Sequence, residues 1–453
     1  MQVTIQPGKV SGIIQANASK SAMQRACAAA LLKEGITIIH NPGISNDDKA
    51  ALDIIQKLGA TITYNGNGTI AIKSAGVDPI NTTINCGESG LSIRMFTPIA
   101  SLSDKKISIT GEGSLVTRPM DFFDEVMPMV GVNCSSENGK LPLQIQGPLQ
   151  PSDITIDGSL SSQFLTGLLM AYGAAPSSKV EHAENKPITI TVTNLKSKPY
   201  IDLTLEIMKA FGLNVPENRN YKEFVFSNST HIMLPDSSDA THHSPLTTHH
   251  SRLTTHDYTV EGDWSGAAFL LVAGAVAGSV TVNGIFNTSR QADKKIVDAI
   301  LDAGADVEVT ATSVKVSKQQ LRAFVFDATD CPDLFPPLVA LAANCDGVTR
   351  IHGLKRLKHK ESDRGLTLQE EFSKLGIRID LEEDIMLVYG KSHIKLLNQT
   401  LNSHHDHRIA MAGVIAALNA DFEIHIRHAE AINKSYPDFY RHMQQLGVQV
   451  ETK

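Results

Sequence analysis

A short pattern recurs six times along this chain: a helix-like stretch ends in glycine, and alternating apolar residues typical of a strand follow. The six copies read IIQKLGATITY, VMPMVGVNC, IMKAFGLNV, ILDAGADVEV, EFSKLGIRID and HMQQLGVQV. Glycine is favoured just after a helix because it adopts the left-handed conformation there without steric cost. A repeat of this kind predicts one structural unit built six times. Its glycines are Gly59, Gly131, Gly212, Gly304, Gly376 and Gly447.

Six apolar helical stretches rich in small residues alternate with the first series and lead into β-rich segments. They include AMQRACAAALL, QFLTGLLMAYG and LFPPLVALAAN. Each unit therefore predicts an apolar helix, a strand, an amphipathic helix and further strands. Because 453 residues exceed one ordinary core, we expect an α/β protein in which the six units form two domains of three.

Composition limits the function classes. The net charge of −7 argues against a nucleic-acid partner bound by bulk electrostatics. The five cysteines are odd in number, widely spaced and free of CxxC, so we expect reduced thiols and a cytoplasmic protein. The start, MQVTIQPGKV, has no apolar signal segment. The longest apolar run, residues 266–278, is too short to span a bilayer and predicts a buried helix.

The residues that precede the six apolar helices are candidate ligand contacts. Ser and Asp are ordinary helix caps, and capping alone explains most of them. A helix start also presents free N–H groups and a partial positive charge, which suits phosphate or carboxylate. If the six starts face one cleft, they form an anion site that needs no metal. In chain order they are Ser19-Lys20-Ser21, Ser89-Gly90, Ser161-Ser162-Gln163, Asp263-Trp264-Ser265, Pro332-Asp333 and Asp406-His407-Arg408.

The segment RLKHKESDRG, residues 356–365, is far more charged than the chain average of 20%. A solvated helix face explains most such runs. Here, however, further cations stand at the entrances to apolar helices, among them Lys20 and Arg408, and Arg118 precedes a proline in a loop that runs into a helix. The arginine fork matches a planar carboxylate or a phosphate. The SKS segment lacks the glycine of a P-loop, so we favour an anion site of another kind.

A histidine-rich tract offers a competing interpretation. THHSPLT at 241–247 is followed by THHSRLT at 248–254, a near-perfect tandem repeat. Paired histidines are compatible with a metal site. Pro245 interrupts helical spacing and no apolar pattern flanks the tract, so we interpret it as a duplication in a tolerant surface loop.

Several motifs together resemble the 3-phosphoshikimate 1-carboxyvinyltransferase (5-enolpyruvylshikimate-3-phosphate synthase) family of enolpyruvyl transferases. The motifs SKSAMQR, DGSLSSQFL, SKPYID, VEGD, PD, KESDR, DHRIAM and K…YPDF occur in the family's order and spacing over essentially the whole chain. The resemblance implies a two-domain inside-out α/β barrel, in which each domain holds three βαβαββ units around buried helices. It places residues 1–18 and 257–453 in one lobe, residues 19–240 in the other, and the histidine-rich insertion 241–256 near the crossover between them.

The implied reaction transfers the enolpyruvyl group of phosphoenolpyruvate to the 5-hydroxyl of shikimate 3-phosphate through a tetrahedral adduct and releases phosphate. The resemblance implies a monomer with these two small-molecule partners and no cofactor, metal, nucleic acid or membrane. It implies Glu361 as the acid for the methylene carbon, with Asp333 or Lys20 as the base on the 5-hydroxyl. The implied phosphoenolpyruvate contacts are Lys20, Gly90, Arg118, Gln163, Arg364, Arg408 and Lys434. The implied shikimate 3-phosphate contacts are Lys20, Ser21, Arg25, Ser161, Ser162, Gln163, Ser197, Asp333 and Lys360.

The chain departs from the family pattern at three places, and two other functions stay open. NASKS replaces a Pro-Gly before Ser-Lys-Ser, GESGLSIRM replaces an asparagine-containing form, and Arg356 stands where an asparagine is common. One alternative is the sister transferase that acts on UDP-N-acetylglucosamine, although residues 113–117 hold neither the cysteine nor the aspartate of that family. The other is a non-catalytic protein that binds anions or, through the histidine tract, a metal.

Overall fold

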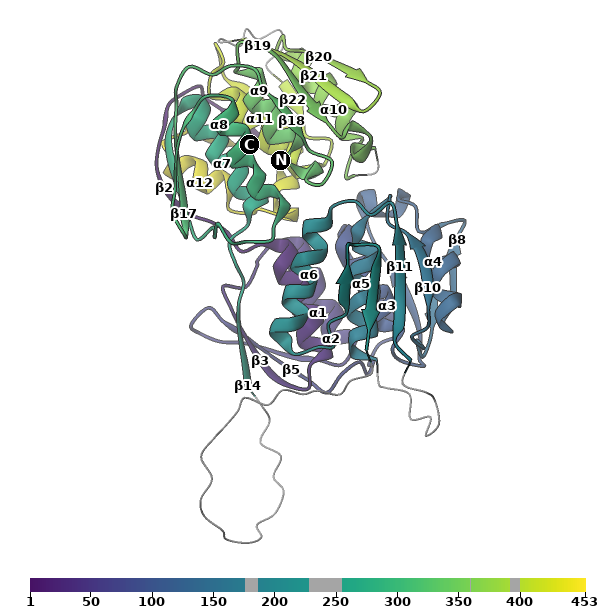
Figure 1. Ribbon diagram of the computed structural model, residues 1–453. Coiled ribbons are helices and arrows are strands. Elements are labelled where there is room, and N and C mark those ends of the chain that lie inside the picture. Colours follow the sequence, from purple (N-terminus) through teal and green to yellow (C-terminus); the bar gives the residue numbers. More distant parts are fainter. Residues whose placement is uncertain (176–185, 228–254, 359, 392–399) are drawn as a thin grey trace.

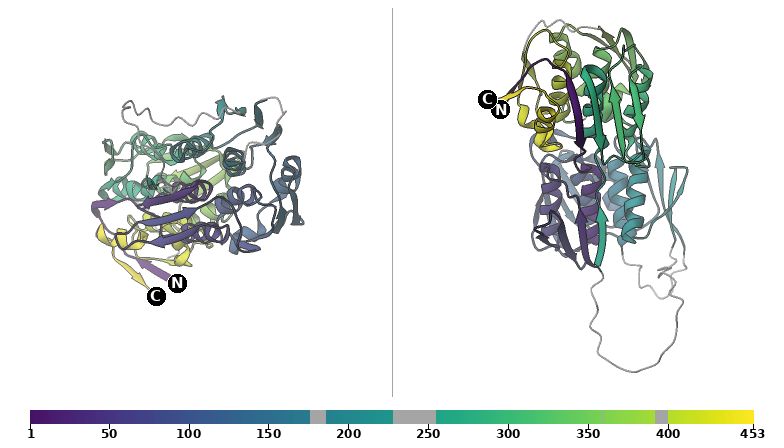
Figure 2. Two further views of the ribbon diagram at one scale, coloured as in Figure 1. Left: turned by 90° about the horizontal axis from the view of Figure 1, so that it is seen from below. Right: turned by 90° about the vertical axis from the view of Figure 1, so that its left-hand side faces the viewer.

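The computed structural model shows two lobes stacked end to end (Figure 1). It describes residues 1–175, 186–227, 255–358, 360–391 and 400–453. We call the lobe that holds α1 to β14 the N-lobe, and the lobe that holds β1, β2 and the elements from α7 to β24 the C-lobe. The two chain ends lie side by side in the C-lobe (Figure 2), where the backbone N–H of Gln2 donates to the carbonyl of Lys453 at 3.0 Å.

Each lobe is walled by three four-stranded sheets, and all six sheets share one pairing pattern. An outer parallel pair is followed by two antiparallel pairings, for example β6 with β7, β7 with β9, and β9 with β8. The sheets of the N-lobe run β14-β3-β5-β4, β6-β7-β9-β8 and β10-β11-β13-β12, and those of the C-lobe run β16-β17-β15-β2, β18-β19-β21-β20 and β22-β23-β1-β24.

The N-lobe strands are β3 (Gly35–His40), β4 (Thr61–Tyr64), β5 (Ile70–Ser74), β6 (Thr83–Asn85), β7 (Lys106–Thr110), β8 (Asn133–Glu137), β9 (Lys140–Gln146), β10 (Ile154–Asp157), β11 (Ile188–Thr193), β12 (Glu217–Arg219), β13 (Glu223–Phe226) and β14 (Thr255–Thr259). The C-lobe strands are β1 (Gln2–Ile5), β2 (Val10–Gln15), β15 (Gly278–Asn283), β16 (Asp306–Val309), β17 (Ser313–Ser317), β18 (Val325–Asp327), β19 (Gly347–His352), β20 (Arg378–Glu382), β21 (Ile385–Gly390), β22 (Thr400–Asn402), β23 (Ile424–Arg427) and β24 (Val450–Thr452).

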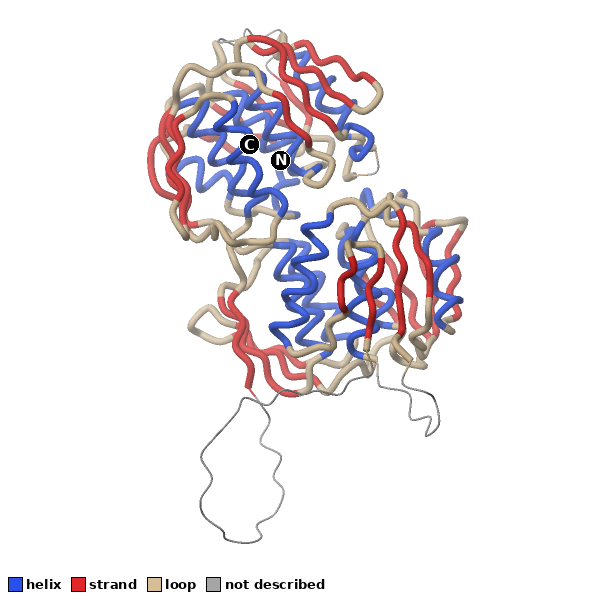
Figure 3. Tube along the Cα trace, in the orientation of Figure 1, coloured by secondary structure: helices blue, strands red, loops and turns tan. Residues whose placement is uncertain are grey.

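The helices lie inside the sheets, as the inside-out arrangement requires (Figure 3). This confirms the predicted fold of six units in two lobes, with open sheets rather than one closed barrel. The apolar helices are α1 (Lys20–Leu32), α3 (Gly90–Ala100), α5 (Ser162–Ala174), α7 (Trp264–Ala277), α9 (Phe335–Ala343) and α11 (His407–Ala417). The second helices of the units are α2 (Asn46–Lys57), α4 (Asp121–Val126), α6 (Lys198–Phe211), α8 (Ile296–Asp302), α10 (Arg364–Lys374) and α12 (Phe439–Gln445). The 3₁₀-helices are η1 (Gly113–Thr117), η2 (Met127–Val130), η3 (Ala292–Lys295), η4 (Pro332–Leu334), η5 (Leu354–Leu357) and η6 (Ala429–Lys434).

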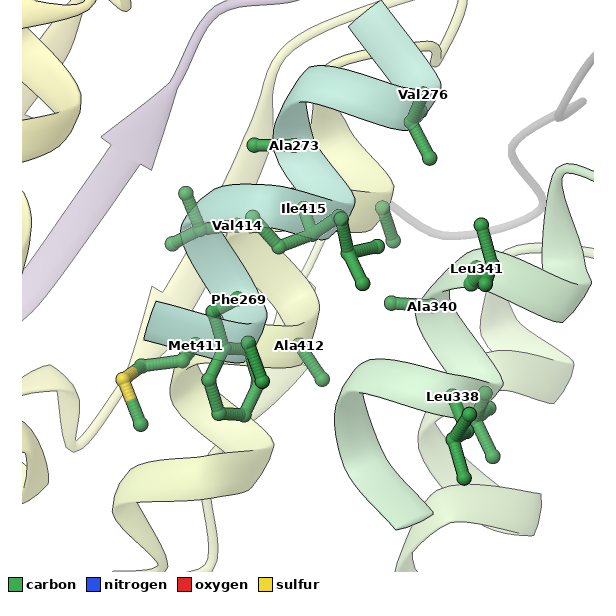
Figure 4. Packing of buried hydrophobic residues seen from close by; sticks show 14 of the residues in the cluster. Phe269, Ala273, Val276, Leu338, Ala340, Leu341, Met411, Ala412, Val414 and Ile415 are labelled. Carbon is green, nitrogen blue, oxygen red and sulfur yellow. The ribbon is translucent and has the colours of Figure 1, made fainter. Parts of the chain in front are cut away.

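The C-lobe core forms where α7, α9 and α11 pack against one another. Phe269 of α7, Leu338 of α9 and Ile415 of α11 all lie in this core (Figure 4). Every residue of α7 is buried, which confirms the buried helix predicted for the apolar run. Small residues let the three helices approach closely, and each large apolar side chain that is fully buried contributes about 1.5–3 kcal/mol.

The repeating glycines close the second helix of each unit, as predicted. Gly59 and Gly304, for example, have φ angles of +113° and +93°. This left-handed region is costly for a residue with a side chain. The other four repeat glycines, Gly131, Gly212, Gly376 and Gly447, also have positive φ angles.

Two chain segments cross between the lobes side by side. Ala18 and Gly262 form an antiparallel bridge, and the backbone N–H of Asp263 donates to the carbonyl of Asn17 at 2.8 Å. Strand β2 pairs with β15 of the C-lobe, whereas β14 pairs with β3 of the N-lobe. The predicted boundary at 257 is therefore wrong by one strand, because residues 257–259 extend an N-lobe sheet. Residues 241–254 of the histidine-rich tract lie outside the described residues.

Candidate active site

All six apolar helices begin at one cleft between the lobes. Its cavity volume is about 360 Å³, within the range of small-molecule sites. Lys20, Gly90 and Ser162 come from the first turns of the N-lobe helices. In the C-lobe, Arg408 comes from the first turn of α11 and Asp333 from η4, which leads into α9. A helix start leaves several N–H groups without intrahelical partners, and a cap satisfies only one or two of them. Backbone N–H donors from the starts of all six apolar helices therefore lie near this cleft.

Local sequence explains why these helices begin there. Ser19, Ser89, Ser161 and Asp263 cap α1, α3, α5 and α7, and each side chain accepts from a backbone N–H of the first turn. Asp406 caps α11 in the same way. Helix α9 instead follows the 3₁₀ turn η4 and has no side-chain cap. Each of these caps therefore satisfies only one or two of the N–H groups at its helix end.

The cleft brings together most of the predicted site residues. Arg364 and Lys434 do not line it; both are buried and ion-paired beside it. The predicted residues that line it are Lys20, Ser21, Arg25, Gly90, Arg118, Ser161, Ser162, Gln163, Ser197, Asp333, Lys360, Glu361 and Arg408.

Arg364 is the centre of a carboxylate network. Its side chain is 1% exposed and contacts Asp406 at 2.8 Å, Asp333 at 2.7 Å and Glu361 at 2.5 Å. Burial acts to lower the pKa of Arg364, but these carboxylates outweigh it and leave the pKa raised. Arg364 therefore fixes both predicted proton-transfer carboxylates in place.

Asp333 stands among three cations. Its Oδ1 lies 3.3 Å from Lys360 Nζ, and its Oδ2 lies 3.1 Å from Arg408 Nη2. Burial acts to raise the pKa of Asp333, but Arg408, Lys360 and Arg364 hold that pKa well below its ordinary value. The carboxyl group is therefore ionised at neutral pH.

Glu361 lies between cations of both lobes. Its Oε2 contacts Arg364, and its Oε1 is 3.7 Å from Nη2 of Arg118 in the N-lobe. Burial acts to raise the pKa of Glu361, but Arg364, Arg118 and Lys434 hold the pKa well below its ordinary value. Without ligand, Glu361 is ionised and is not a proton donor.

Lys20 is protonated in this arrangement. Its Nζ lies 2.9 Å from Oδ2 of Asp47. Burial lowers the pKa of Lys20, but Asp47 and Glu361 outweigh it and leave the pKa raised. Lys20 therefore adds a positive charge to the cleft.

Gly90 and Arg94 form one wall of the cleft. A Cβ atom on Gly90 would lie 2.7 Å from Nη1 of Arg118 and 3.0 Å from Nη1 of Arg94. Arg94 Nη1 also donates to Oε1 of Gln163 at 2.8 Å, and its guanidinium lies over the ring of Phe164. Burial and Arg118 lower the pKa of Arg94 to about 9. Sequence reasoning missed Arg94, although an arginine one turn after Gly90 inside an apolar helix was a usable signal.

The other predicted hydroxyl contacts form a second wall. Ser161 and Ser162 begin α5, and Ser197 has a left-handed backbone with φ +56° before α6. Arg25 lies behind them, 1% exposed, and its Nε donates to Oγ1 of Thr204 at 2.9 Å. Burial lowers the pKa of Arg25 to about 10. This wall supplies neutral donors backed by an arginine that has no carboxylate partner among the described residues.

Arg356 joins the lobes at this wall. Its Nη1 donates to the carbonyl of Ser159 at 2.8 Å, and its Nη2 donates to Oγ of Ser197 at 3.2 Å. The N–H of Ser197 donates back to Asp330 of the C-lobe at 2.6 Å. Arg356, which departs from the family pattern, thus links the C-lobe to the N-lobe beside the cleft.

The cleft carries a local excess of positive charge. Among the described residues that line it are nine Lys or Arg and five Asp or Glu, a balance of 9 − 5 = +4 within a chain of −7. His407 lines it as well, with both ring nitrogens lacking hydrogen-bond partners. Burial and Arg408 hold the pKa of His407 well below its ordinary value. The site thus suits small molecules with several negative charges.

Metal-ligating groups occur away from the cleft. Two groups of described residues could hold an ion: His405, His428 and Glu430, and Glu370, Glu371 and His404. None of these residues lines the cleft. Among the described residues, no helix is both long and apolar enough to cross a membrane.

Comparisons with known proteins agree with this geometry. The family model described as EPSP synthase (3-phosphoshikimate 1-carboxyvinyltransferase) matches residues 5–443. The chain is 34% identical to the 3-phosphoshikimate 1-carboxyvinyltransferase of Clostridium novyi, over 98% of this chain and 97% of that protein. It is 33% identical to the protein of that name from Methanocorpusculum labreanum, over 99% of each. An EPSP synthase structure from Acinetobacter baumannii superposes with a TM-score of 0.76 at 23% identity, covering all of both chains. The enolpyruvyl transferase NikO from Streptomyces tendae superposes with a TM-score of 0.74 at 17% identity, over 99% of this chain and 98% of that one. At these sequence identities, the similarity to the two solved structures supports the fold alone.

Proposed function

The chain belongs to the EPSP synthase (3-phosphoshikimate 1-carboxyvinyltransferase) family, and from this premise we propose which residues carry out its reaction. The enzyme transfers the enolpyruvyl group of phosphoenolpyruvate to the 5-hydroxyl of shikimate 3-phosphate, in the pathway that leads to aromatic amino acids. Each substrate carries a phosphate and a carboxylate. The observation that carries the proposal is the excess of four positive charges in a cleft shared by two lobes.

Phosphoenolpyruvate lies against Lys20, Gly90 and Arg118 on the N-lobe side and against Arg408 on the C-lobe side. Arg364, which is buried beside the cleft, completes the proposed C-lobe contacts. Gly90 lets the guanidinium groups of Arg118 and Arg94 approach its backbone, because a Cβ there would lie 2.7 Å and 3.0 Å from their Nη1 atoms. Two arginine forks from opposite lobes match a carboxylate and a phosphate. Gln163 and Lys434 complete the proposed set.

Shikimate 3-phosphate lies against the wall of hydroxyl groups. Ser161, Ser162 and Ser197 donate to its phosphate, and Arg25 supports that charge from behind. Ser21, Lys20, Gln163, Lys360 and Asp333 complete the proposed contacts. The two lobes bring different groups to the cleft, and closure of the lobes on the substrates would expel water.

Asp333 is the base on the 5-hydroxyl. It is ionised, the form that accepts a proton, whereas Lys20 is held protonated by Asp47. As the 5-oxygen bonds to C2 of phosphoenolpyruvate, its proton passes to Asp333. We therefore assign the role of base, which the sequence left open between Asp333 and Lys20, to Asp333.

Glu361 delivers a proton to the methylene carbon of phosphoenolpyruvate. Its ion pairs with Arg364 and Arg118 oppose protonation in the ligand-free site. Substrate anions that bind these arginines weaken both pairs, so the pKa of Glu361 rises when the site fills. In the second step the C2–O bond to phosphate breaks and Glu361 takes the proton back from the methyl group, while the proton held by Asp333 passes to the departing phosphate. The enolpyruvyl ether and free phosphate remain.

We propose a monomer that works in the cytoplasm. All five cysteines are free, in keeping with a reducing compartment.

A phosphate-release assay tests the function. The purified chain is incubated with phosphoenolpyruvate and either shikimate 3-phosphate or UDP-N-acetylglucosamine. We expect phosphate with the first acceptor alone. Phosphate release with UDP-N-acetylglucosamine would refute the proposal. So would the absence of phosphate release with both acceptors.

A further inference from the structure

Glu88 and Lys434 form an ion pair that joins the lobes. Glu88 lies between β6 and α3 in the N-lobe, and Lys434 ends η6 in the C-lobe. Their Oε2 and Nζ atoms are 2.7 Å apart, and the Lys434 side chain is 6% exposed. The ammonium group proposed to bind phosphoenolpyruvate is thus already occupied by a carboxylate of this chain.

The loop that follows β7 is built around that carboxylate. Gly113 has φ +52°, and a Cβ there would lie 2.5 Å from Oε2 of Glu88. The backbone N–H of Ser114 donates to the same oxygen at 3.4 Å. Any side chain at position 113 would expel the carboxylate, so this position admits Glu88 because it is glycine.

The same loop carries a second proposed phosphoenolpyruvate contact. Oγ of Ser114 accepts from Nη2 of Arg118 at 3.0 Å, and Arg118 faces Glu361 across the cleft. Lys434 also lowers the pKa of Glu361, which places its charge near the same carboxylate. Glu88 therefore stands at the end of the site where the proposed phosphoenolpyruvate cations gather.

We propose that Glu88 determines the affinity for phosphoenolpyruvate by competing with its phosphate for Lys434. The inference rests on the proposed function, since it assigns the displaced group to that site. In the ligand-free enzyme Glu88 neutralises Lys434 and holds the lobes together. An incoming phosphate must take its place or bind against its negative charge.

The competition predicts which variant binds more tightly. Glu88→Gln keeps the size of the side chain and removes its charge, so Lys434 becomes free for the substrate. We expect KM for phosphoenolpyruvate and the inhibition constant of inorganic phosphate to fall about three- to fivefold, the factor that corresponds to a partly exposed ion pair. KM for shikimate 3-phosphate changes less than twofold, because the second wall does not contact Glu88.

Three further variants separate competition from a merely structural role. Glu88→Asp keeps the negative charge, so its KM for phosphoenolpyruvate should be closer to that of the parent enzyme than to that of Glu88→Gln. Glu112→Gln is the matched control, because Glu112 lies next to the same loop and accepts from Asn85 rather than from Lys434. In a Lys434→Met background, Glu88→Gln should have no further effect on the affinity for phosphoenolpyruvate.

The decisive readout does not depend on turnover. The thermal midpoint is measured against rising inorganic phosphate for the parent, Glu88→Gln and the double variant. The half-saturating phosphate concentration should fall three- to fivefold in Glu88→Gln and stay at the value of Lys434→Met in the double variant. An unchanged or raised value in Glu88→Gln, or an equal fall in the Lys434→Met background, overturns the inference. Failure of the parent chain to release phosphate from both substrates would instead refute the proposed function, while this titration still decides the role of Glu88.

Discussion

Arg118 of the N-lobe and Glu361 of the C-lobe face each other across the cleft, with 3.7 Å between Nη2 and Oε1. This distance makes the protonation of Glu361 sensitive both to lobe closure and to any anion bound by Arg118. The relationship also shows why neither lobe alone forms the site.

Glu361→Gln should lower kcat/KM at least 30-fold, or about 2 kcal/mol, because the amide no longer delivers a proton to the methylene carbon. Steady-state phosphate release measures the loss. Glu370→Gln on the exposed side of the same region is the control and should be silent. Near-parental turnover by Glu361→Gln would remove this residue from the mechanism.

Arg118→Ala should raise KM for phosphoenolpyruvate about tenfold or more, since a hydrogen bond to a charged group contributes about 1.5–3 kcal/mol. KM for shikimate 3-phosphate should change far less. Arg118→Lys restores part of the affinity because it keeps the charge but loses the fork. The exposed Arg378→Ala serves as control. Equal effects on both substrates contradict the assignment.

Arg356→Ala should open the ligand-free molecule, because it removes donors to the Ser159 carbonyl and the Ser197 hydroxyl of the other lobe. Small-angle scattering should show a larger radius of gyration than for the parent. Arg350→Ala, on β19 of the same lobe, is the matched control. Identical scattering of Arg356→Ala and the parent would show that Arg356 does not hold the lobes together.

Asp48, which lies outside the cleft, should make the unfolding free energy of the protein depend on pH. Burial raises the pKa of Asp48 to about 7, although hydrogen bonds from Ser45 lower it. The folded state then binds this proton more tightly than the unfolded state, whose pKa is about 3.9. The stabilisation is therefore present below about pH 4 and is lost as the pH rises through about 7.

Asp48→Asn should remove this loss of unfolding free energy at high pH, because the amide does not titrate. Between pH 5 and pH 8 the parent should lose about 2.5 kcal/mol of unfolding free energy that Asp48→Asn retains. Urea unfolding at the two pH values measures the difference. Asp53→Asn, exposed on the same helix, is the control. Parallel pH dependence of the parent and Asp48→Asn would place the titration elsewhere.

The local signals of the fold were readable from the sequence because they act over short distances. A positive φ angle at Gly59 or Gly304 needs nothing beyond its own helix, and caps such as Ser89 lie next to the helices they begin. The error at residues 257–259 has a different cause. Strand β14 pairs with β3, which lies more than two hundred residues away in the sequence. The sequence of β14 alone does not predict which strand it pairs with.

The site shows the same division. Lys20, Arg118 and Arg408 could be proposed because they stand at helix entrances or in a loop before one. Glu88 could not, since its partner Lys434 is 346 residues distant and the pair exists only when the lobes close. Ion-pair partners set the charge states of Glu361 and Lys20, so those states also required the structure.

A crystal structure of Glu361→Gln with shikimate 3-phosphate and phosphoenolpyruvate bound would show directly whether the two lobes share the substrates. We expect both ligands between the lobes, with anionic oxygens of phosphoenolpyruvate within hydrogen-bond distance of Arg118 from one lobe and of Arg364 or Arg408 from the other. Ligands held by one lobe alone, or bound outside this cleft, would contradict a site shared by the two lobes.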